Sequence, residues 1–138
     1  ILILLRRFAD DRGVGDQVFN SDLPFSPNRI YTIFSKKGII RGFHGHRTEW
    51  KAFYIPQGSC KFLAIEMQKK KVKPDIYVLN EKKAEILVIP PNHYNGFVAL
   101  EDCFIICLSS LTLEDSLKDD IRVNAFAYGK DIWEVKYR

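Results

Sequence analysis

Short runs rich in Ile, Val, Phe and Tyr recur along the chain at the spacing of β-strands. They cover residues 29–34, 52–55, 60–67, 75–79, 85–89, 96–99 and 103–108. Gly, Pro or Asn separates many of these runs, which is typical of turns between strands. Residues 113–121 alone favour a helix, with Thr112 as a candidate N-cap and acidic residues at its start. The pattern predicts an all-β sandwich or barrel and not an alternation of strands and helices.

The first of these predicted strands, residues 29–35, carries two polar side chains on one face. Alternation puts Arg29 and Tyr31 on that face, whereas Ile30 and Phe34 share the opposite face. Because both faces also hold bulky apolar residues, we expect the strand to be covered on both sides. Arg29 and Tyr31 then need polar partners, which a ligand cavity would supply. The alternative is a tyrosine that is hydrogen-bonded within the core.

Two histidines, His44 and His46, stand in the segment Arg41-Gly-Phe-His-Gly-His46. On a strand they project from the same face, and the glycines on either side of His44 leave room for a close approach. Such a pair serves metal ligation, general acid–base chemistry or ordinary packing. The same-face placement, with glycines and Arg41 beside it, favours a functional pair.

A metal site is not expected, because the further ligands that it needs are missing. A His-x-His strand site requires a carboxylate and usually another histidine on the same cavity wall. Glu49 lies three residues after His46, so a continuing strand would turn it to the opposite face, and the residue of matching parity is Trp50. The third histidine, His93, lies in a Pro-rich loop whose direction the sequence does not fix. We therefore expect no metal and no other cofactor.

Length and charge narrow the classes of function. A chain of 138 residues with 46% hydrophobic and 28% charged residues suits one globular domain, which we place at residues 1–138. The net charge of +4 is mild, and we interpret the lysine-rich run at residues 69–73 as a solvated loop. A nucleic-acid partner is therefore not expected. Modest positive charge suits a small anionic ligand such as a sugar phosphate.

The apolar run and the cysteines indicate where the protein works. Residues 1–5 are too few to span a membrane, and the two arginines follow this run instead of preceding it as in a signal peptide. Cys60, Cys103 and Cys107 lie in apolar segments without a CxxC pair, which indicates buried free thiols in a reducing compartment. We expect a cytoplasmic protein with no membrane partner.

Three motifs stand out, at residues 41–46, at Gly58-Ser-Cys60 and at Ile89-Pro-Pro-Asn-His-Tyr-Asn-Gly-Phe97. Together they resemble the RmlC-like cupin family of nucleotide-sugar isomerases and epimerases. The RGFHxH-like segment and the RxYxIF-like strand before it resemble the dTDP-4-keto-6-deoxyglucose 3,4-ketoisomerases. The DxRG-like start at residues 10–13, the Pro-Pro loop and the tail at residues 129–136 resemble the dTDP-4-dehydrorhamnose 3,5-epimerases. The resemblance implies a single cupin jelly-roll barrel of two antiparallel sheets, a homodimer and a dTDP-linked 4-keto-6-deoxy sugar as substrate.

The resemblance also implies site residues. Either His44 or His46 is the base, the other is a proton shuttle or oxyanion donor, and Tyr31 is the hydroxyl acid. The implied substrate-binding positions are Arg29, Arg41, Arg12, His93 and Asn95. The arginines would hold diphosphate oxygens or a developing oxyanion.

Two departures bear on which reaction the chain carries out. Asn95 stands where the epimerases have a loop histidine, and Ile106 stands where they have an acid tyrosine. Both departures favour 3,4-ketoisomerisation over 3,5-epimerisation. The same two changes motivate a non-catalytic nucleotide-sugar-binding cupin as an alternative. A metal-dependent cupin such as a dioxygenase is a further alternative.

Overall fold

The structure is a computed structural model that describes residues 1–19, 22–68 and 73–135. Its strands are β1 (Leu2–Leu4), β2 (Arg6–Asp10), β3 (Gly13–Gln17), β4 (Arg29–Ser35), β5 (Ile40–His46), β6 (Lys51–Gln57), β7 (Ser59–Glu66), β8 (Asp75–Asn80), β9 (Glu85–Ile89), β10 (His93–Ala99), β11 (Cys103–Ser109) and β12 (Ile121–Arg122). The helices are α1 (Leu113–Lys118) and a 3-10 turn, η1 (Asp131–Trp133). The all-β class is confirmed.

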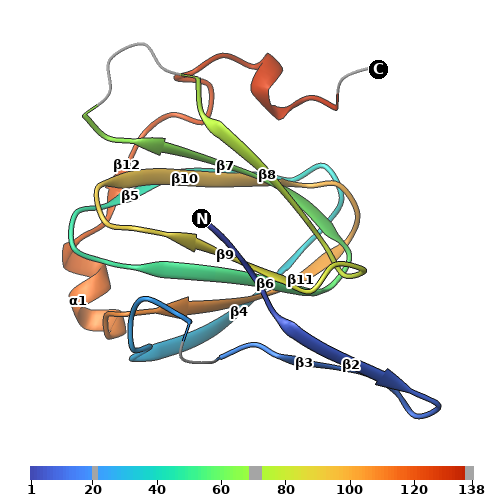
Figure 1. Ribbon diagram of the computed structural model, residues 1–138. Coiled ribbons are helices and arrows are strands. Elements are labelled where there is room, and N and C mark those ends of the chain that lie inside the picture. The colour runs from blue at the N-terminus through green and yellow to red at the C-terminus, as the bar shows by residue number, and fades with distance from the viewer. Residues whose placement is uncertain (20–21, 69–72, 136–138) are drawn as a thin grey trace.

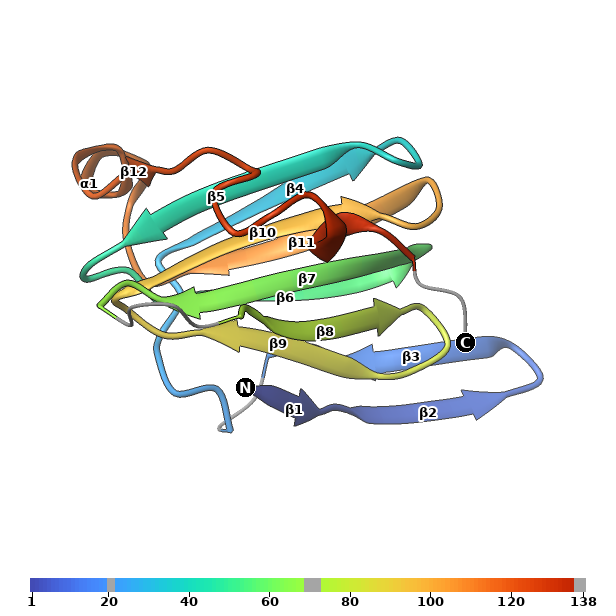
Figure 2. The same cartoon turned by 90° about the horizontal axis from the view of Figure 1, so that it is seen from above.

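Two five-stranded antiparallel sheets face each other, one with the order β1-β9-β6-β11-β4 and the other β12-β5-β10-β7-β8 (Figures 1 and 2). The pairing is nested, because β4 pairs with β11, β5 with β10, β6 with β9 and β7 with β8. Such nested pairing is typical of jelly-roll folds, in which one long hairpin is folded back on itself. The hairpin β2–β3 projects from one end as a separate two-stranded sheet (Figure 1).

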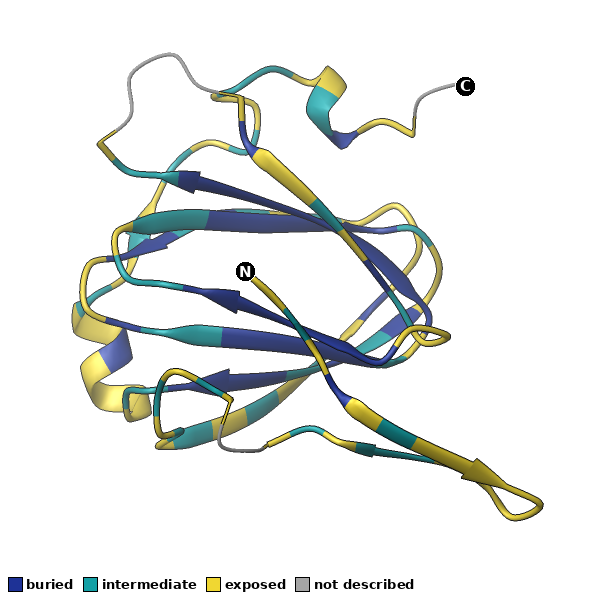
Figure 3. Cartoon of the chain, viewed as in Figure 1, coloured by how far each residue is buried: buried dark blue, intermediate teal, exposed yellow. Residues whose placement is uncertain are grey.

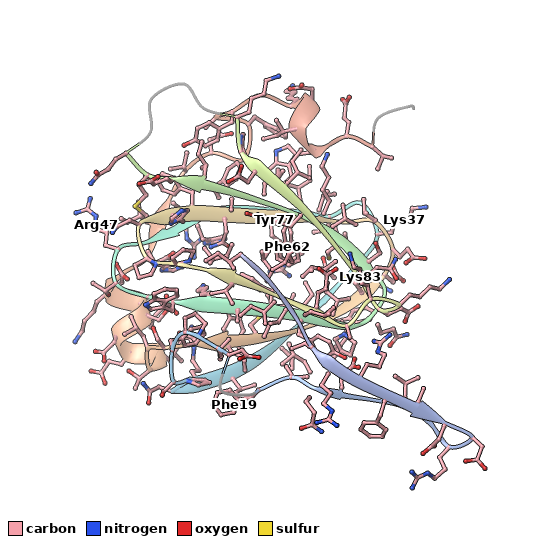
Figure 4. All side chains as sticks on the ribbon, viewed as in Figure 1. Phe19, Lys37, Arg47, Phe62, Tyr77 and Lys83 are labelled. Carbon is pink, nitrogen blue, oxygen red and sulfur yellow. The ribbon has the colours of Figure 1, made fainter. Side chains whose placement is uncertain are left out.

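Apolar side chains from both sheets fill the space between them. The central cluster includes Phe53 of β6, Phe62 of β7 and Phe97 of β10, all buried. Phe62 contacts both other rings, at centroid distances of 4.9 and 5.2 Å. Figure 3 shows the buried residues concentrated on the central strands, and Figure 4 shows Phe62 between the sheets. Aromatic contacts between the two layers therefore hold the sheets at a fixed spacing.

The prediction that residues 29–35 are covered on both sides is wrong for the single chain. The inward face of β4 packs on the core, but Ile30 is 67% and Phe34 55% exposed on the outward face. β4 is the last strand of its sheet, and none of the chain's described segments packs over that face. An apolar surface is therefore left open at this sheet edge.

The predicted helix is shorter than expected. Thr112 caps it as predicted, accepting a hydrogen bond from the Asp115 backbone N–H, but the helix ends at Lys118. The chain then runs through Asp119 into β12, which pairs with β5. The first three strands were not predicted, and most of the lysine run at residues 69–73 lies outside the described residues. Among the described residues, none of the helices has the length and apolar character needed to cross a bilayer.

Candidate active site

His44 and His46 lie near the end of β5 and line one cavity. The register of the sheet places Asn95 of β10 opposite His44, and His93 opposite His46. Both β5 histidines line an opening of about 400 Å³ beside α1. Their predicted placement on one face is therefore confirmed.

A second cavity of about 190 Å³ adjoins the first. Tyr31, His44 and Lys51 line both cavities. The smaller cavity is also walled by the core residues Phe53 and Phe97, so it lies deeper between the sheets. We call them the outer and inner cavities. The three shared side chains stand where the two cavities meet.

A carboxylate backs His44 from the segment that follows α1. Nδ1 of His44 lies 3.6 Å from Oδ1 of Asp120, whose Oδ2 accepts a 3.0 Å hydrogen bond from Arg122. Burial lowers the pKa of His44 below its usual value, and Asp120 opposes this only in part. The imidazole is therefore neutral at pH 7. With Nδ1 facing Asp120, Nε2 is the nitrogen left to act as a base.

His46 is held by a buried carboxylate that the sequence analysis placed elsewhere. Nδ1 of His46 lies 2.9 Å from Oε2 of Glu49 and 2.7 Å from the backbone oxygen of Asp119. Both partners are acceptors, so Nδ1 carries a hydrogen. Nε2 is buried and has no hydrogen-bond partner among the residues that the structure describes. The prediction that Glu49 faces away was wrong because β5 ends at His46. The chain turns at residues 47–48, which brings Glu49 back beneath the histidine, while Trp50 stacks on Phe25 outside the sheet.

The network around Glu49 tests whether these groups fit a metal. One ligand atom from each of His46, Glu49 and Asp119 lies within 4.8 Å of the others. The oxygens of Glu49 already accept from both Ser109 and Ser116 and pair with Arg29 at 3.2 Å. The Asp119 carboxylate accepts from the backbone N–H groups of residues 47, 48 and 49. These lone pairs are engaged and a guanidinium stands beside them, so the donor set fits an internal hydrogen-bonded network better than a metal.

Tyr31 and Lys51 face the histidines from the opposite sheet. The Arg29 guanidinium lies 4.8 Å from the centre of the Tyr31 ring, and Nζ of Lys51 lies 5.9 Å from it. Burial raises the pKa of Tyr31, so the phenol keeps its proton. Burial also lowers the pKa of Lys51, although Glu49 opposes this. A cation and a proton donor thus face His44 across the cavity.

Of the other predicted site residues, some line the two cavities and others do not. Arg41 and Asn95 line the inner cavity, and the Asn95 amide donates to the His44 backbone oxygen at 3.4 Å. Arg29 lines the outer cavity, but its guanidinium also pairs with Glu49. His93 lines neither of the two cavities and approaches the Pro91 oxygen at 2.9 Å. Arg12 is exposed at the tip of the β2–β3 hairpin, where it pairs with Asp10. The structure does not bring Arg12 to the cavities of its own chain.

Three residues at the site were missed by the sequence analysis: Lys51, Asp120 and Glu49. Lys51 shares the inward parity of Phe53 and Ile55 on β6, and a lysine in register with core residues is a usable signal. No comparable signal marks Asp120, because it was assigned to the predicted helix. It reaches His44 only because the helix ends early.

Comparison with known proteins agrees with this geometry. The crystal structure of dTDP-4-dehydrorhamnose 3,5-epimerase from Sulfolobus tokodaii is 29% identical with a TM-score of 0.82, over 98% of this chain and 81% of that chain. A double mutant of the QdtA 3,4-ketoisomerase from Thermoanaerobacterium thermosaccharolyticum, in complex with TDP, is 27% identical with a TM-score of 0.75, over 96% and 92%. The spore coat polysaccharide biosynthesis protein SpsL of Bacillus subtilis is 23% identical over 126 residues, 86% of this chain and 83% of the relative.

The fold is that of an RmlC-like cupin, and these similar structures are described as nucleotide-sugar isomerases and epimerases. The chain belongs to the family described as "FdtA: WxcM-like, C-terminal", which matches residues 2–124. The family resemblance seen in the sequence is thereby confirmed. Similar structures include both 3,5-epimerases and 3,4-ketoisomerases, so they support the class and do not distinguish the two reactions.

Proposed function

We propose that the chain is a metal-independent isomerase that converts a dTDP-linked 4-keto-6-deoxy sugar to the 3-keto sugar. The observation that carries the proposal is the meeting of His44, backed by Asp120, with Tyr31 and Lys51 between the two cavities. Similar proteins described as 3,4-ketoisomerases, one in complex with TDP, support the substrate class.

In the proposed reaction, protons move between two neighbouring carbons of the sugar. The 4-keto group acidifies the hydrogen on C3, and Nε2 of His44 removes it. The electron pair moves to O4, where the ammonium of Lys51 stabilises the oxyanion and the phenol of Tyr31 supplies a proton. Tyr31 then recovers a proton from O3 as the C3 ketone forms, and His44 returns its proton to C4. One hydrogen has moved from C3 to C4 and one from O3 to O4.

Substrate binding is proposed for the charged residues around the cavities. Arg41, on the inner cavity, can hold a sugar or diphosphate oxygen, and Asn95 offers an amide beside it. Arg29 serves chiefly to hold Glu49, and through it His46, in place. In this proposal His46 therefore supports the base, and His44 is the base.

A homodimer is also proposed. Ile30 and Phe34 form an apolar strip on the outward face of the edge strand β4, and a second copy would cover it. The phosphate contact proposed for Arg12 needs such a copy, because the hairpin carries Arg12 away from its own cavities. Phe34→Glu should shift the mass measured by light scattering from dimer to monomer. A monomeric wild-type protein would refute the proposal.

The second candidate reaction is 3,5-epimerisation. Tyr31 lies on the sheet opposite His44, and an acid on the far side of the sugar is what inversion requires. The 29% identical Sulfolobus protein is described as such an epimerase. Against this reaction, positions 105 and 106 of β11 hold isoleucines, which have no acidic group. Ile105 is buried in the core and Ile106 packs outside the sheet. The β11 residue opposite Tyr31 is Cys107, so β11 offers no second tyrosine there.

Proton NMR of dTDP-4-keto-6-deoxyglucose incubated with the protein in deuterated water separates the candidates. Appearance of the 3-keto sugar supports the ketoisomerase. Deuterium at C3 and C5 with an inverted product supports the epimerase. An unchanged spectrum with proven binding supports the non-catalytic alternative. His44→Asn should abolish the reaction, whereas Arg47→Gln, an exposed position just after β5 (Figure 4), is the matched control.

A further inference from the structure

Two buried cysteines lie against each other at the end of the sheets away from α1. The sulfur atoms of Cys60 and Cys103 are 3.1 Å apart, and neither residue has exposed surface. Cys60 is on β7 of one sheet and Cys103 begins β11 of the other. A covalent bond between them would therefore join the two layers of the fold.

We propose that Cys60 and Cys103 are a redox-active pair that forms an inter-sheet disulfide. The sulfur atoms need to approach by only about 1 Å, since the bonded distance is about 2.05 Å. The proposed reaction does not use either cysteine. The pair is a site of reversible covalent modification in the core.

The backbone holds the two cysteines together. The turn between β6 and β7 packs directly on the turn between β10 and β11, and the Leu100 N–H donates to the Ser59 oxygen at 2.9 Å. Gly58 has a φ of +91°, and a Cβ there would lie 2.7 Å from Cβ of Cys103. Only a glycine permits this approach. Figure 1 shows both turns at the right of the molecule and α1 at the left.

The third cysteine provides an internal control. Cys107 is also fully buried, but it lies opposite Tyr31 on β4, in the region of the inner cavity. Cys107 is four residues from Cys103 along β11, about 13 Å on an extended strand, so its sulfur is out of bonding reach of that cysteine. No disulfide between Cys107 and either partner is expected.

The chemistry is thiol–disulfide exchange with a small-molecule disulfide such as oxidised glutathione. One cysteine thiolate attacks the small disulfide, which gives a mixed disulfide and releases one small thiol. The second thiolate then attacks the protein sulfur of that mixed disulfide and releases the other small thiol. Two cysteines are oxidised and one small disulfide is reduced to two thiols. Burial raises the pKa of both protein thiols, so exchange proceeds during folding or local opening.

The cross-link should stabilise the fold without closing the cavities. It joins positions 43 residues apart, and a loop of this length strongly restricts the unfolded chain. By linkage, folding should favour the disulfide over the dithiol by the same factor by which the disulfide favours folding. We expect the native chain to form it on the order of 100-fold or more readily than the chain in urea.

The test is refolding of the full chain from urea into glutathione redox buffers, followed by acid quenching, alkylation and mass spectrometry. During refolding both thiols are open to the glutathione couple, so their burial in the native fold does not block the reaction. Expected are one alkylated cysteine, Cys107, and a cross-linked peptide pair containing Cys60 and Cys103. Cys107→Ser should keep the cross-link, and Cys60→Ser should lose it. Three alkylated cysteines in an oxidising buffer, or a cross-link that includes Cys107, would overturn the proposal. The wild-type peptide map decides the matter even if Cys60→Ser does not fold.

Discussion

The buried carboxylate of Glu49 should be a main support of the site, and Glu49→Gln tests this. Glu49 has 1% exposure and is bonded to His46, Arg29, Ser109 and Ser116. Glutamine keeps the volume and one acceptor oxygen. It removes the charge that offsets Arg29, and it places an amide donor where a second acceptor is needed.

The size of the effect follows from the pKa of Glu49. Burial works to raise this pKa, but hydrogen bonds from His46 and Ser109 prevail and lower it from 4.5 to about 2. A carboxyl with these folded and unfolded values contributes about 3 kcal/mol of stability at neutral pH. Because the folded pKa is the lower one, this contribution is complete above pH 4.5 and is lost as the pH falls toward 2. At pH 3 about 1 kcal/mol should remain.

Urea unfolding followed by tryptophan fluorescence measures the difference. At pH 7 the Glu49→Gln variant should be less stable by about 3 kcal/mol, or about 10 °C in Tm. At pH 3 the gap between variant and wild type should narrow to about 1 kcal/mol. Glu101→Gln, at an exposed turn, is the matched control and should change stability by less than about 0.5 kcal/mol. A gap of equal size at both pH values would refute the charge-based reasoning.

Three further predictions concern the chemistry. As the pH is lowered, kcat/KM should fall with an apparent pKa below 6.5, because burial lowers the pKa of His44 and only its neutral form is a base. A kcat/KM profile that already falls above pH 7 on the acid side would contradict this. Asp120→Asn should lower kcat by about 10- to 1,000-fold with little change in KM, and a change in KM alone would show that Asp120 serves binding instead. Lys51→Met should lower kcat by about 100-fold or more while the fold is kept, as checked by circular dichroism, and an unchanged kcat would exclude Lys51 as the oxyanion partner.

Much of the fold could be predicted because strand alternation is a local property. All seven apolar runs are strands in the structure, although β10 begins three residues earlier than expected. The N-terminal strands β1 to β3 were missed, because their pairing partners decide them more than their sequence does. β1 exists by pairing with β9, more than 80 residues away. The hairpin β2–β3 is mostly exposed and has little apolar patterning to reveal it.

The same rule applies to the candidate site: residues placed by local strand alternation were predicted, and residues placed by distant contacts were not. His44, His46 and Tyr31 were predicted because their directions follow from the strands that carry them. Glu49 was assigned to the wrong face because the parity argument assumed that β5 continues past His46. What ends the strand is the carboxylate of Asp119, which binds three successive N–H groups of the turn from some 70 residues away. No local pattern records such a contact.

Asp119 and Asp120 show how one short segment sets both halves of the site. They are neighbours in the short segment between α1 and β12, and their carboxylates reach different partners. Asp119 fixes the turn that returns Glu49 to His46, whereas Asp120 stands beside His44. The pairing of β12 with β5, at Ile121 opposite Gly45, holds both carboxylates in place. The geometry of the proposed base therefore depends on where α1 ends, because the two acidic residues just after the helix position both the proposed base and the turn after β5.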